Sequence, residues 1–153
     1  MKHQVCALLV TGRETVAMRN GAGYGSARFP NQYNGFGGTM LPGESARSAA
    51  ERFTAIQSER RFVGDPLAWT CIHQERFPDS QIIVHYMARE MTEAEHADVT
   101  QHNKATGSSP VHVLQNASTD FGSYRSLQYA DGMSYIVPMA LAHFIRGYTV
   151  LPG

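Results

Sequence analysis

The sequence is poor in the features that define several large classes of protein. Its 153 residues include two cysteines, Cys6 and Cys71, which lie far apart and match no metal-binding spacing. We therefore expect neither a disulfide framework nor a cysteine zinc site, but two buried free thiols in a reducing compartment. An excess of one charge is also missing, because 13 basic residues balance 13 acidic ones. No bulk electrostatic field is available to recruit long nucleic acid or an anionic membrane.

Long apolar runs are absent as well. No stretch is long enough to cross a bilayer, and the first residues, "MKHQVCALLVTG", lack a secretory cleavage pattern. We expect a cytoplasmic protein with no membrane partner. What remains is the composition of a globular domain, with 42% hydrophobic and 17% charged residues. A chain of this length can bury a core without disulfides or metals, so we predict one domain spanning residues 1–153.

Apolar patterning in the first half predicts two strands and a helix. The continuous apolar run at 5–10 is typical of a strand buried on both faces, and 15–20 would form a hairpin with it. A Gly-rich loop at 21–33 and a glycine corner at 37–38 lead to a helix that "PGES" begins and Ser45 caps. The predicted apolar stripe of this helix comprises Ala46, Ala49, Ala50, Phe53 and Ile56.

The second half continues the alternation. Residues 66–77 and 80–90 are predicted as two long strands joined by the turn "PDS", and "TEAE" is a capping box for a helix at 93–101. A strand at 110–115 follows, and then a final helix at 132–148 with Pro138 tolerated near its first turn. The order β-β-α-β-β-α-β-α predicts an α/β (α+β) fold in which helices sandwich a mixed sheet.

One stretch of this sequence resembles a known signature. "YNGFGGTMLPGESARSAAER" is similar to the box of the Nudix (MutT-like) hydrolases, in which glycine, five residues, glutamate and seven residues precede Arg-Glu-apolar-any-Glu-Glu. Gly38, Glu44 and Arg52 fall on that pattern in register. The run 33–38 and the segment "YADGMSYIVP" also resemble the oxidised-purine nucleoside triphosphatase branch. The resemblance implies a Nudix-type mixed sheet sandwiched between helices.

The same resemblance implies a metal site that this sequence does not complete. Nudix hydrolases cleave a phosphoanhydride with divalent cations held by acids on this helix, at the positions that here are Phe53, Ile56 and Gln57. Only Gln57 offers an oxygen, which the carbonyl of Gly37 or Gly38 could join. Since Mg²⁺ normally binds one or two carboxylates, we expect it to bind weakly or not at all. Glu44 is implied to hold Arg52 and shape the loop.

Substrate contacts are also implied by the resemblance. Asn34 would hydrogen-bond a purine edge, Tyr129 would stack on the ring, Asp131 would contact another edge, and Arg19 would lie near the phosphates. Each position also has an ordinary interpretation, because Asn-Gly and Asp-Gly are common in turns, a tyrosine packs, and a strand-end arginine is exposed. Gly132 departs from the acid pair of the triphosphatase branch.

A catalytic base is harder to assign. The related triphosphatases place an acid just before the strand here predicted at 110–115, but this chain has Ser108 and Ser109. Glu90, Glu93 and Glu95 lie earlier in the chain. A strand histidine that faces a cleft can act as a base, and His85 is the best single candidate. A structural histidine is the alternative.

Two functional hypotheses follow. The first is a Nudix hydrolase that binds a nucleotide or nucleoside-diphosphate derivative and cleaves its phosphoanhydride at an atypical metal site. The alternative is a catalytically inactive nucleotide-binding or interaction protein. "ERFT" resembles the departure in a Nudix branch that cleaves GDP-mannose, so a broken box does not by itself exclude activity. That branch, however, keeps an acid at the position of Gln57. The partner expected under both hypotheses is a small-molecule nucleotide, and the oligomeric state is not indicated.

Overall fold

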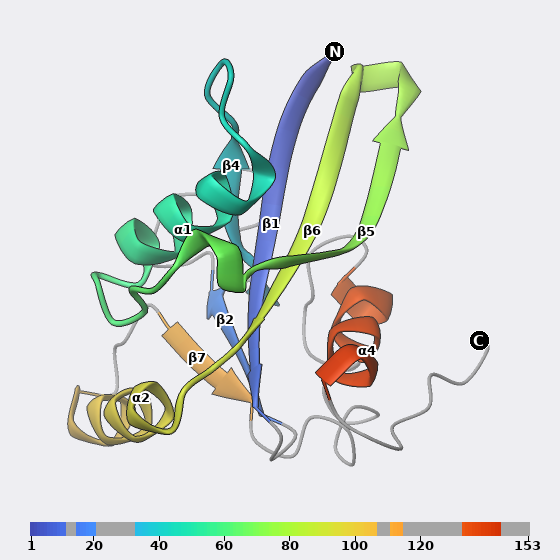
Figure 1. Ribbon diagram of the computed structural model, residues 1–153. Coiled ribbons are helices and arrows are strands. Elements are labelled where there is room, and N and C mark those ends of the chain that lie inside the picture. The colour runs from blue at the N-terminus through green and yellow to red at the C-terminus, as the bar shows by residue number, and fades with distance from the viewer. Residues whose placement is uncertain (12–14, 21–32, 107–110, 115–132, 145–153) are drawn as a thin grey trace.

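The computed structural model describes residues 1–11, 15–20, 33–106, 111–114 and 133–144 (Figure 1). Its strands are β1 (Lys2–Thr11), β2 (Thr15–Asn20), β3 (Tyr33–Asn34), β4 (Phe36–Thr39), β5 (Thr70–Phe77), β6 (Ile82–Glu90) and β7 (Val111–Leu114). Its helices are α1 (Ala46–Gln57), α2 (Glu93–Thr106) and α4 (Met133–Phe144), with 3₁₀ turns at Pro66–Ala68 and Pro78–Ser80. Within these described residues, no helix combines the length and the apolarity needed to cross a bilayer.

The described strands form one mixed sheet. Its order is β3-β2-β1-β6-β5, while β4 also pairs with β1 and β7 with β2. The central strand β1 runs parallel to β6 and antiparallel to β2 and β4. The predicted hairpins are both present, because β2 pairs with β1 and β5 pairs with β6. A β-bulge between Cys71 and His73 interrupts the register of β5.

Helices cover both faces of this sheet, as the sequence predicted. Alternate residues of a strand point to opposite faces, so the apolar run of β1 contributes to two cores. Cys6, Leu8 and Val10 pack with residues of α4, and Val5, Ala7 and Leu9 pack with residues of α1. Figure 1 shows α1 and α4 on opposite sides of β1. The prediction of a strand buried on both faces is confirmed.

The glycine pair predicted as a corner is instead part of strand β4. Gly37 and Gly38 pair with Cys6 and Val5 of β1. A side chain at Gly37 would collide with the backbone carbonyl of Val5, so the absence of a side chain here allows β4 to pair closely with β1. The short strands β3 and β4 were both missed, and α1 is joined to the centre of the sheet through β4.

The helix boundaries follow their caps. Ser45 caps α1 by accepting from the backbone N–H of Ser48, as predicted. The capping box of α2 is also present, with Glu95 N–H donating to Thr92 Oγ1 and Thr92 N–H donating to Glu95 Oε1. This helix continues to Thr106, beyond the predicted end.

Three local predictions were wrong. Residues 66–68, predicted as the start of a strand, form a 3₁₀ turn. The Asp65 side chain accepts from Leu67 N–H, and Pro66 is the first residue of the turn. Pro138 lies inside α4, past the first turn, and is buried on the sheet. Cys71 is an exposed thiol and only Cys6 is buried, because Cys71 lies on β5 at the outer edge of the described sheet.

Candidate functional site

Glu44 and Arg52 form the ion pair that the resemblance implied. Arg52 Nε donates to Glu44 Oε2 at 2.7 Å, and Arg52 Nη2 donates to Oε1 at 2.8 Å. The backbone N–H of Leu41 donates to the same carboxylate at 3.0 Å, so Glu44 ties the loop after β4 to the middle of α1. The hydrogen bond from Arg52 lowers the pKa of Glu44 and outweighs burial, which raises it. The hydrogen bond from Glu44 raises the pKa of Arg52.

Gln57 forms a second link between α1 and β4, and it does so with both ends of its amide. Gly37 N–H donates to Gln57 Oε1 at 2.8 Å, and Gln57 Nε2 donates to the Gly37 carbonyl at 2.9 Å. The side chain therefore pairs with the backbone of β4 as a neighbouring strand would. Two of the three oxygens that the sequence offered for a cation, Gln57 Oε1 and the Gly37 carbonyl, accept a hydrogen bond from the protein. The third belongs to Gly38, which pairs with Val5 of β1.

Phe53 fills the space beside Gly38. A methyl group built on Gly38 would lie 2.7 Å from Phe53 Cζ, so the ring rests directly on the glycine backbone. The Arg52 guanidinium lies 4.3 Å from the centroid of the same ring, within the range of a cation–π contact. Phe53 is half-buried and packs against the α1-side core, as the predicted stripe required.

Ile56 does not belong to that stripe. Its side chain is 63% exposed, while Ala49, Ala50, Glu51 and Thr54 are the buried residues of α1. At about 100° per residue, this buried face is centred between Ala50 and Thr54, roughly a quarter-turn from the face that the apolar pattern indicated. The apolar pattern did not indicate this position of the buried face, because two of its residues, Glu51 and Thr54, are polar.

The described residues of α1 offer no carboxylate at the positions where the resemblance places the magnesium ligands. The three positions that the resemblance assigns to acids carry an aromatic ring against Gly38, an exposed isoleucine and an amide bonded to Gly37. Across the residues that the structure describes, no group of three or more His, Cys, Asp or Glu side chains is arranged to hold a metal ion. Since Mg²⁺ takes oxygen ligands with at least one carboxylate, the residues present do not fit it.

His85 lies apart from the polar residues of α1. Val5 of β1 pairs with His85 on one side and with Gly38 on the other, so the two are two strand spacings apart, about 10 Å. His85 Nε2 is 2.9 Å from His3 Nδ1, and His85 Nδ1 is 3.0 Å from Gln74 Nε2. Burial lowers the pKa of His85, and the charge on His3 lowers it further. Both effects favour the neutral imidazole.

The predicted substrate contacts are only partly described. Arg19 of β2 and Asn34 of β3 are direct cross-strand partners, so the backbone brings these two positions together. Tyr129, Asp131, Ser108 and Ser109 lie outside the described residues.

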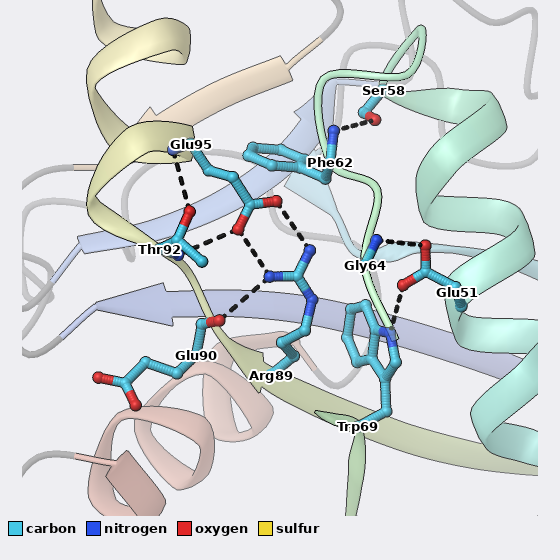
Figure 2. A network of polar contacts seen from close by, with 9 residues as sticks. All are labelled: Glu51, Ser58, Phe62, Gly64, Trp69, Arg89, Glu90, Thr92 and Glu95. Atoms are coloured by element: carbon cyan, nitrogen blue, oxygen red, sulfur yellow. Dashed lines mark hydrogen bonds and ion pairs between the residues drawn. The ribbon is translucent and has the colours of Figure 1, made fainter. Parts of the chain in front are cut away.

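A buried polar network beside α1 escaped the sequence analysis (Figure 2). Glu51 accepts hydrogen bonds from Gly64 N–H and from Trp69 Nε1, and Arg89 pairs with Glu95 at 2.7 and 2.9 Å. The Arg89 guanidinium lies over the Trp69 ring, 5.4 Å from its centroid. The capping box and the single tryptophan were the two available signals. This network fixes the position of α1 and α2 relative to β6.

Comparison with known proteins identifies the fold. A MutT/nudix family protein from Listeria innocua superposes with a TM-score of 0.64 at 12% identity, over 93% of this chain and 92% of that chain. A MutT structure from a study of Aliivibrio salmonicida and Vibrio cholerae gives 0.55 at 13% identity, over 89% and 94%. A MutT/nudix family protein from Enterococcus faecalis also matches, at 16% identity over 60% of this chain and 37% of that chain, but its TM-score of 0.49 adds nothing to the fold assignment. No family model and no curated protein matches the sequence.

Proposed function

We propose that this chain, which has the Nudix fold, binds a nucleotide or a nucleoside-diphosphate derivative without hydrolysing it by a magnesium-dependent reaction. The observation that carries the proposal is the double hydrogen bond between the Gln57 amide and Gly37. It occupies, with neutral groups, the place where the resemblance requires carboxylates and cations. The charge that develops on a phosphoryl group during cleavage would then have no cation beside it.

What supports retained binding is the architecture around that place. The Glu44–Arg52 pair still fixes the loop between β4 and α1, and Gln57 and Phe53 hold the helix against β4. These contacts stabilise the shape of the fold without supplying its usual negative charge. Arg19 and Asn34 remain neighbours on β2 and β3, where the resemblance places a phosphate contact and a base contact.

Hydrolysis of the bound phosphoanhydride is the second candidate. One observation favours it: burial lowers the pKa of His85, which favours the form of the imidazole that accepts a proton in base catalysis. Such a reaction would require the substrate to reach β6 as well as β2 and β3.

Calorimetry with purine nucleoside mono-, di- and triphosphates tests both candidates. Each titration is run with Mg²⁺ and again with chelator, and release of phosphate or pyrophosphate is followed in parallel. We expect the same dissociation constant in both buffers and no release. Phosphate release that disappears with chelator would overturn the proposal, and so would the absence of binding by every nucleotide.

Two variants locate the nucleotide. We expect Arg19→Gln to weaken binding of the triphosphate more than that of the monophosphate, because the lost charge is the one that the resemblance assigns to the phosphates. Asn34→Ala should weaken all purine nucleotides equally. Arg76→Gln on β5 removes the same charge elsewhere on the sheet and is the matched control. Equal effects of Arg19→Gln and Arg76→Gln would contradict the assigned position.

A further inference from the structure

We propose that His3 and His85 form a two-imidazole site for a borderline divalent transition metal ion, namely Ni²⁺, Cu²⁺ or Zn²⁺. The site lies at the end of the β1–β6 pair and does not depend on nucleotide binding. Imidazole nitrogen suits these three ions, whereas Mg²⁺ prefers oxygen. The inference rests on the separation of the two ring nitrogens, on their hydrogen-bond partner and on the strands that hold them.

The separation of the two nitrogens fits cis coordination. His3 Nδ1 and His85 Nε2 are 2.9 Å apart. With metal–nitrogen bonds of about 2.0–2.1 Å, that separation corresponds to a nitrogen–metal–nitrogen angle of about 90°. This is the angle between adjacent ligands in octahedral or tetragonal coordination, which Ni²⁺ and Cu²⁺ adopt. Tetrahedral Zn²⁺ requires the nitrogens to separate to about 3.3 Å.

The hydrogen bonds allow the His85 ring to make room for a metal ion by moving one proton between its two nitrogens. An amide nitrogen only donates, so Gln74 Nε2 donates to His85 Nδ1. The ring proton of His85 is then on Nε2, which donates to His3 Nδ1. When the metal binds, that proton moves to His85 Nδ1, and the imidazole stays neutral. The Gln74 amide then turns so that its Oε1 accepts the Nδ1–H. A metal-binding histidine usually has such a partner on its second nitrogen.

The two ligands and their hydrogen-bond partner Gln74 come from three paired strands, which limits their movement. His85 of β6 pairs with Val5 of β1 and with Gln74 of β5. His3 lies two residues before Val5, so alternation along β1 places both histidines on the α1-side face of the sheet. The ring centroids are 5.2 Å apart and the planes 21° apart, so the two rings lie nearly edge to edge with their nitrogens facing each other. Each ring has to rotate by about 45° to direct its lone pair at the metal. His3 is exposed, so it can rotate and water can complete the coordination.

Calorimetry and thermal unfolding of the full chain, without a histidine tag, test the site. The probes are NiCl₂, CuCl₂, ZnCl₂ and MgCl₂ added to chelator-treated protein. We expect one equivalent of Ni²⁺, Cu²⁺ or Zn²⁺ to bind and to raise the Tm, with Cu²⁺ the tightest. Mg²⁺ should do neither. Failure of all three transition metals to bind, or stabilisation by Mg²⁺ as well, would overturn the proposal.

Variants separate this site from adventitious binding to other histidines. We expect His3→Ala and His85→Ala each to weaken Ni²⁺ at least tenfold. His73→Ala, on the same β5–β6 hairpin but against Tyr86, should leave the affinity unchanged. Gln74→Leu removes the acceptor for His85 Nδ1–H and should cost about tenfold, whereas Gln74→Glu should restore or raise the affinity.

The variants also protect the test against misfolding. His3→Ala changes an exposed side chain, so it reports on the site even if His85→Ala fails to fold. Unchanged Ni²⁺ affinity in His3→Ala would overturn the proposal, as would an equal loss in the His73→Ala control.

Discussion

At the scale of single residues, Phe53 shows how one substitution changes what this fold can hold. Its ring lies against Gly38 on one side and contacts the Arg52 guanidinium, so it is bound into the packing of the loop. A carboxylate at this position would instead attract a cation. The glycine and the aromatic ring are complementary, and neither should tolerate change independently of the other.

The first prediction concerns that complementarity. Gly38→Ala places a methyl group 2.7 Å from the Phe53 ring, which must move aside, and we expect the free energy of unfolding to fall by about 1–2 kcal/mol. In the double variant Gly38→Ala/Phe53→Ala the overlap is gone. Its loss in free energy of unfolding should therefore be smaller than the sum of the losses in the two single variants. Urea unfolding of the four proteins measures the cycle. Gly64→Ala is the control, because its methyl group meets Arg89 at an ordinary 3.6 Å.

Sequence patterns indicated some residue contacts and missed others. The Glu44–Arg52 pair was implied by the resemblance to the Nudix box, and the structure contains it. The contacts of Glu51 could not be predicted, because its partners Gly64 and Trp69 come from a segment whose path no local pattern specifies. Ile56 was assigned to the core for the opposite reason, since apolar periodicity ignores buried polar residues.

At the scale of elements, the end of α1 is formed without glycine. Glu59 and Arg60 have φ angles of 54° and 64°, in the left-handed region that favours glycine. The turn is held by Arg60 N–H, which donates to the Ala55 carbonyl at 2.7 Å, and by Phe62 N–H, which donates to Ser58 Oγ at 3.1 Å. Local hydrogen bonds therefore hold a conformation that the two side chains disfavour.

The second prediction follows from that strain. A residue with a Cβ in the left-handed region costs about 1–2 kcal/mol, and replacing it by glycine removes that cost. The greater freedom of glycine in the unfolded chain offsets part of this gain in stability. We expect Glu59→Gly to raise the free energy of unfolding by about 0.5–1 kcal/mol. Glu59→Ala removes the charge and keeps the Cβ, so it should bring no gain. Urea unfolding distinguishes the two, and stabilisation of equal size in both would contradict the explanation.

Elements with their own local signals were predictable and the others were not. The long strand at β1 and the caps of α1 and α2 are encoded in adjacent residues. Strands β3 and β4 are two and four residues long and include glycines at Gly37 and Gly38. They are extended because β2 and β1 pair with them, which is a tertiary cause that no short window of sequence contains.

At the scale of the whole molecule, the Arg89–Glu95 pair joins the sheet to α2. The two side chains are 5% and 13% exposed, and Arg89 Nη1 also donates to the Glu90 carbonyl (Figure 2). Burial by itself raises the pKa of Glu95. The hydrogen bonds from Arg89 and from the Thr92 backbone together outweigh that effect, so the net pKa is lowered. Folding is thereby linked to the protonation of Glu95.

The third prediction is the pH dependence of stability. Because the folded pKa lies below the ordinary 4.5, the unfolded chain binds more protons near that pH, and the contribution of Glu95 is complete above pH 4.5. It is lost as the pH falls through the folded pKa. Glu95→Gln leaves the Arg89 charge buried without its partner, so we expect a loss of about 3 kcal/mol at pH 7. The variant should also show a flatter decline in acid.

The neighbouring acid provides the control for this prediction. Glu90→Gln makes the same change in charge on an exposed side chain whose backbone, not its carboxylate, contacts Arg89. It should change the free energy of unfolding by less than about 0.5 kcal/mol. Urea unfolding at pH 7 and at pH 4 measures both variants, and an equal loss in the two would refute the assignment.

The parallel pairing of β1 with β6 has a consequence for synthesis of the chain. His3 and His85 meet across that pair although they are 82 positions apart in sequence. The largely buried strand β1 therefore leaves the ribosome long before the strand that will cover one of its edges. Contacts of such long range form slowly. One edge of β1 therefore stays unpaired, and open to aggregation, while the elements from β2 to β5 are made. We therefore expect slow refolding, with this edge of β1 exposed until β6 has been made and has paired with it.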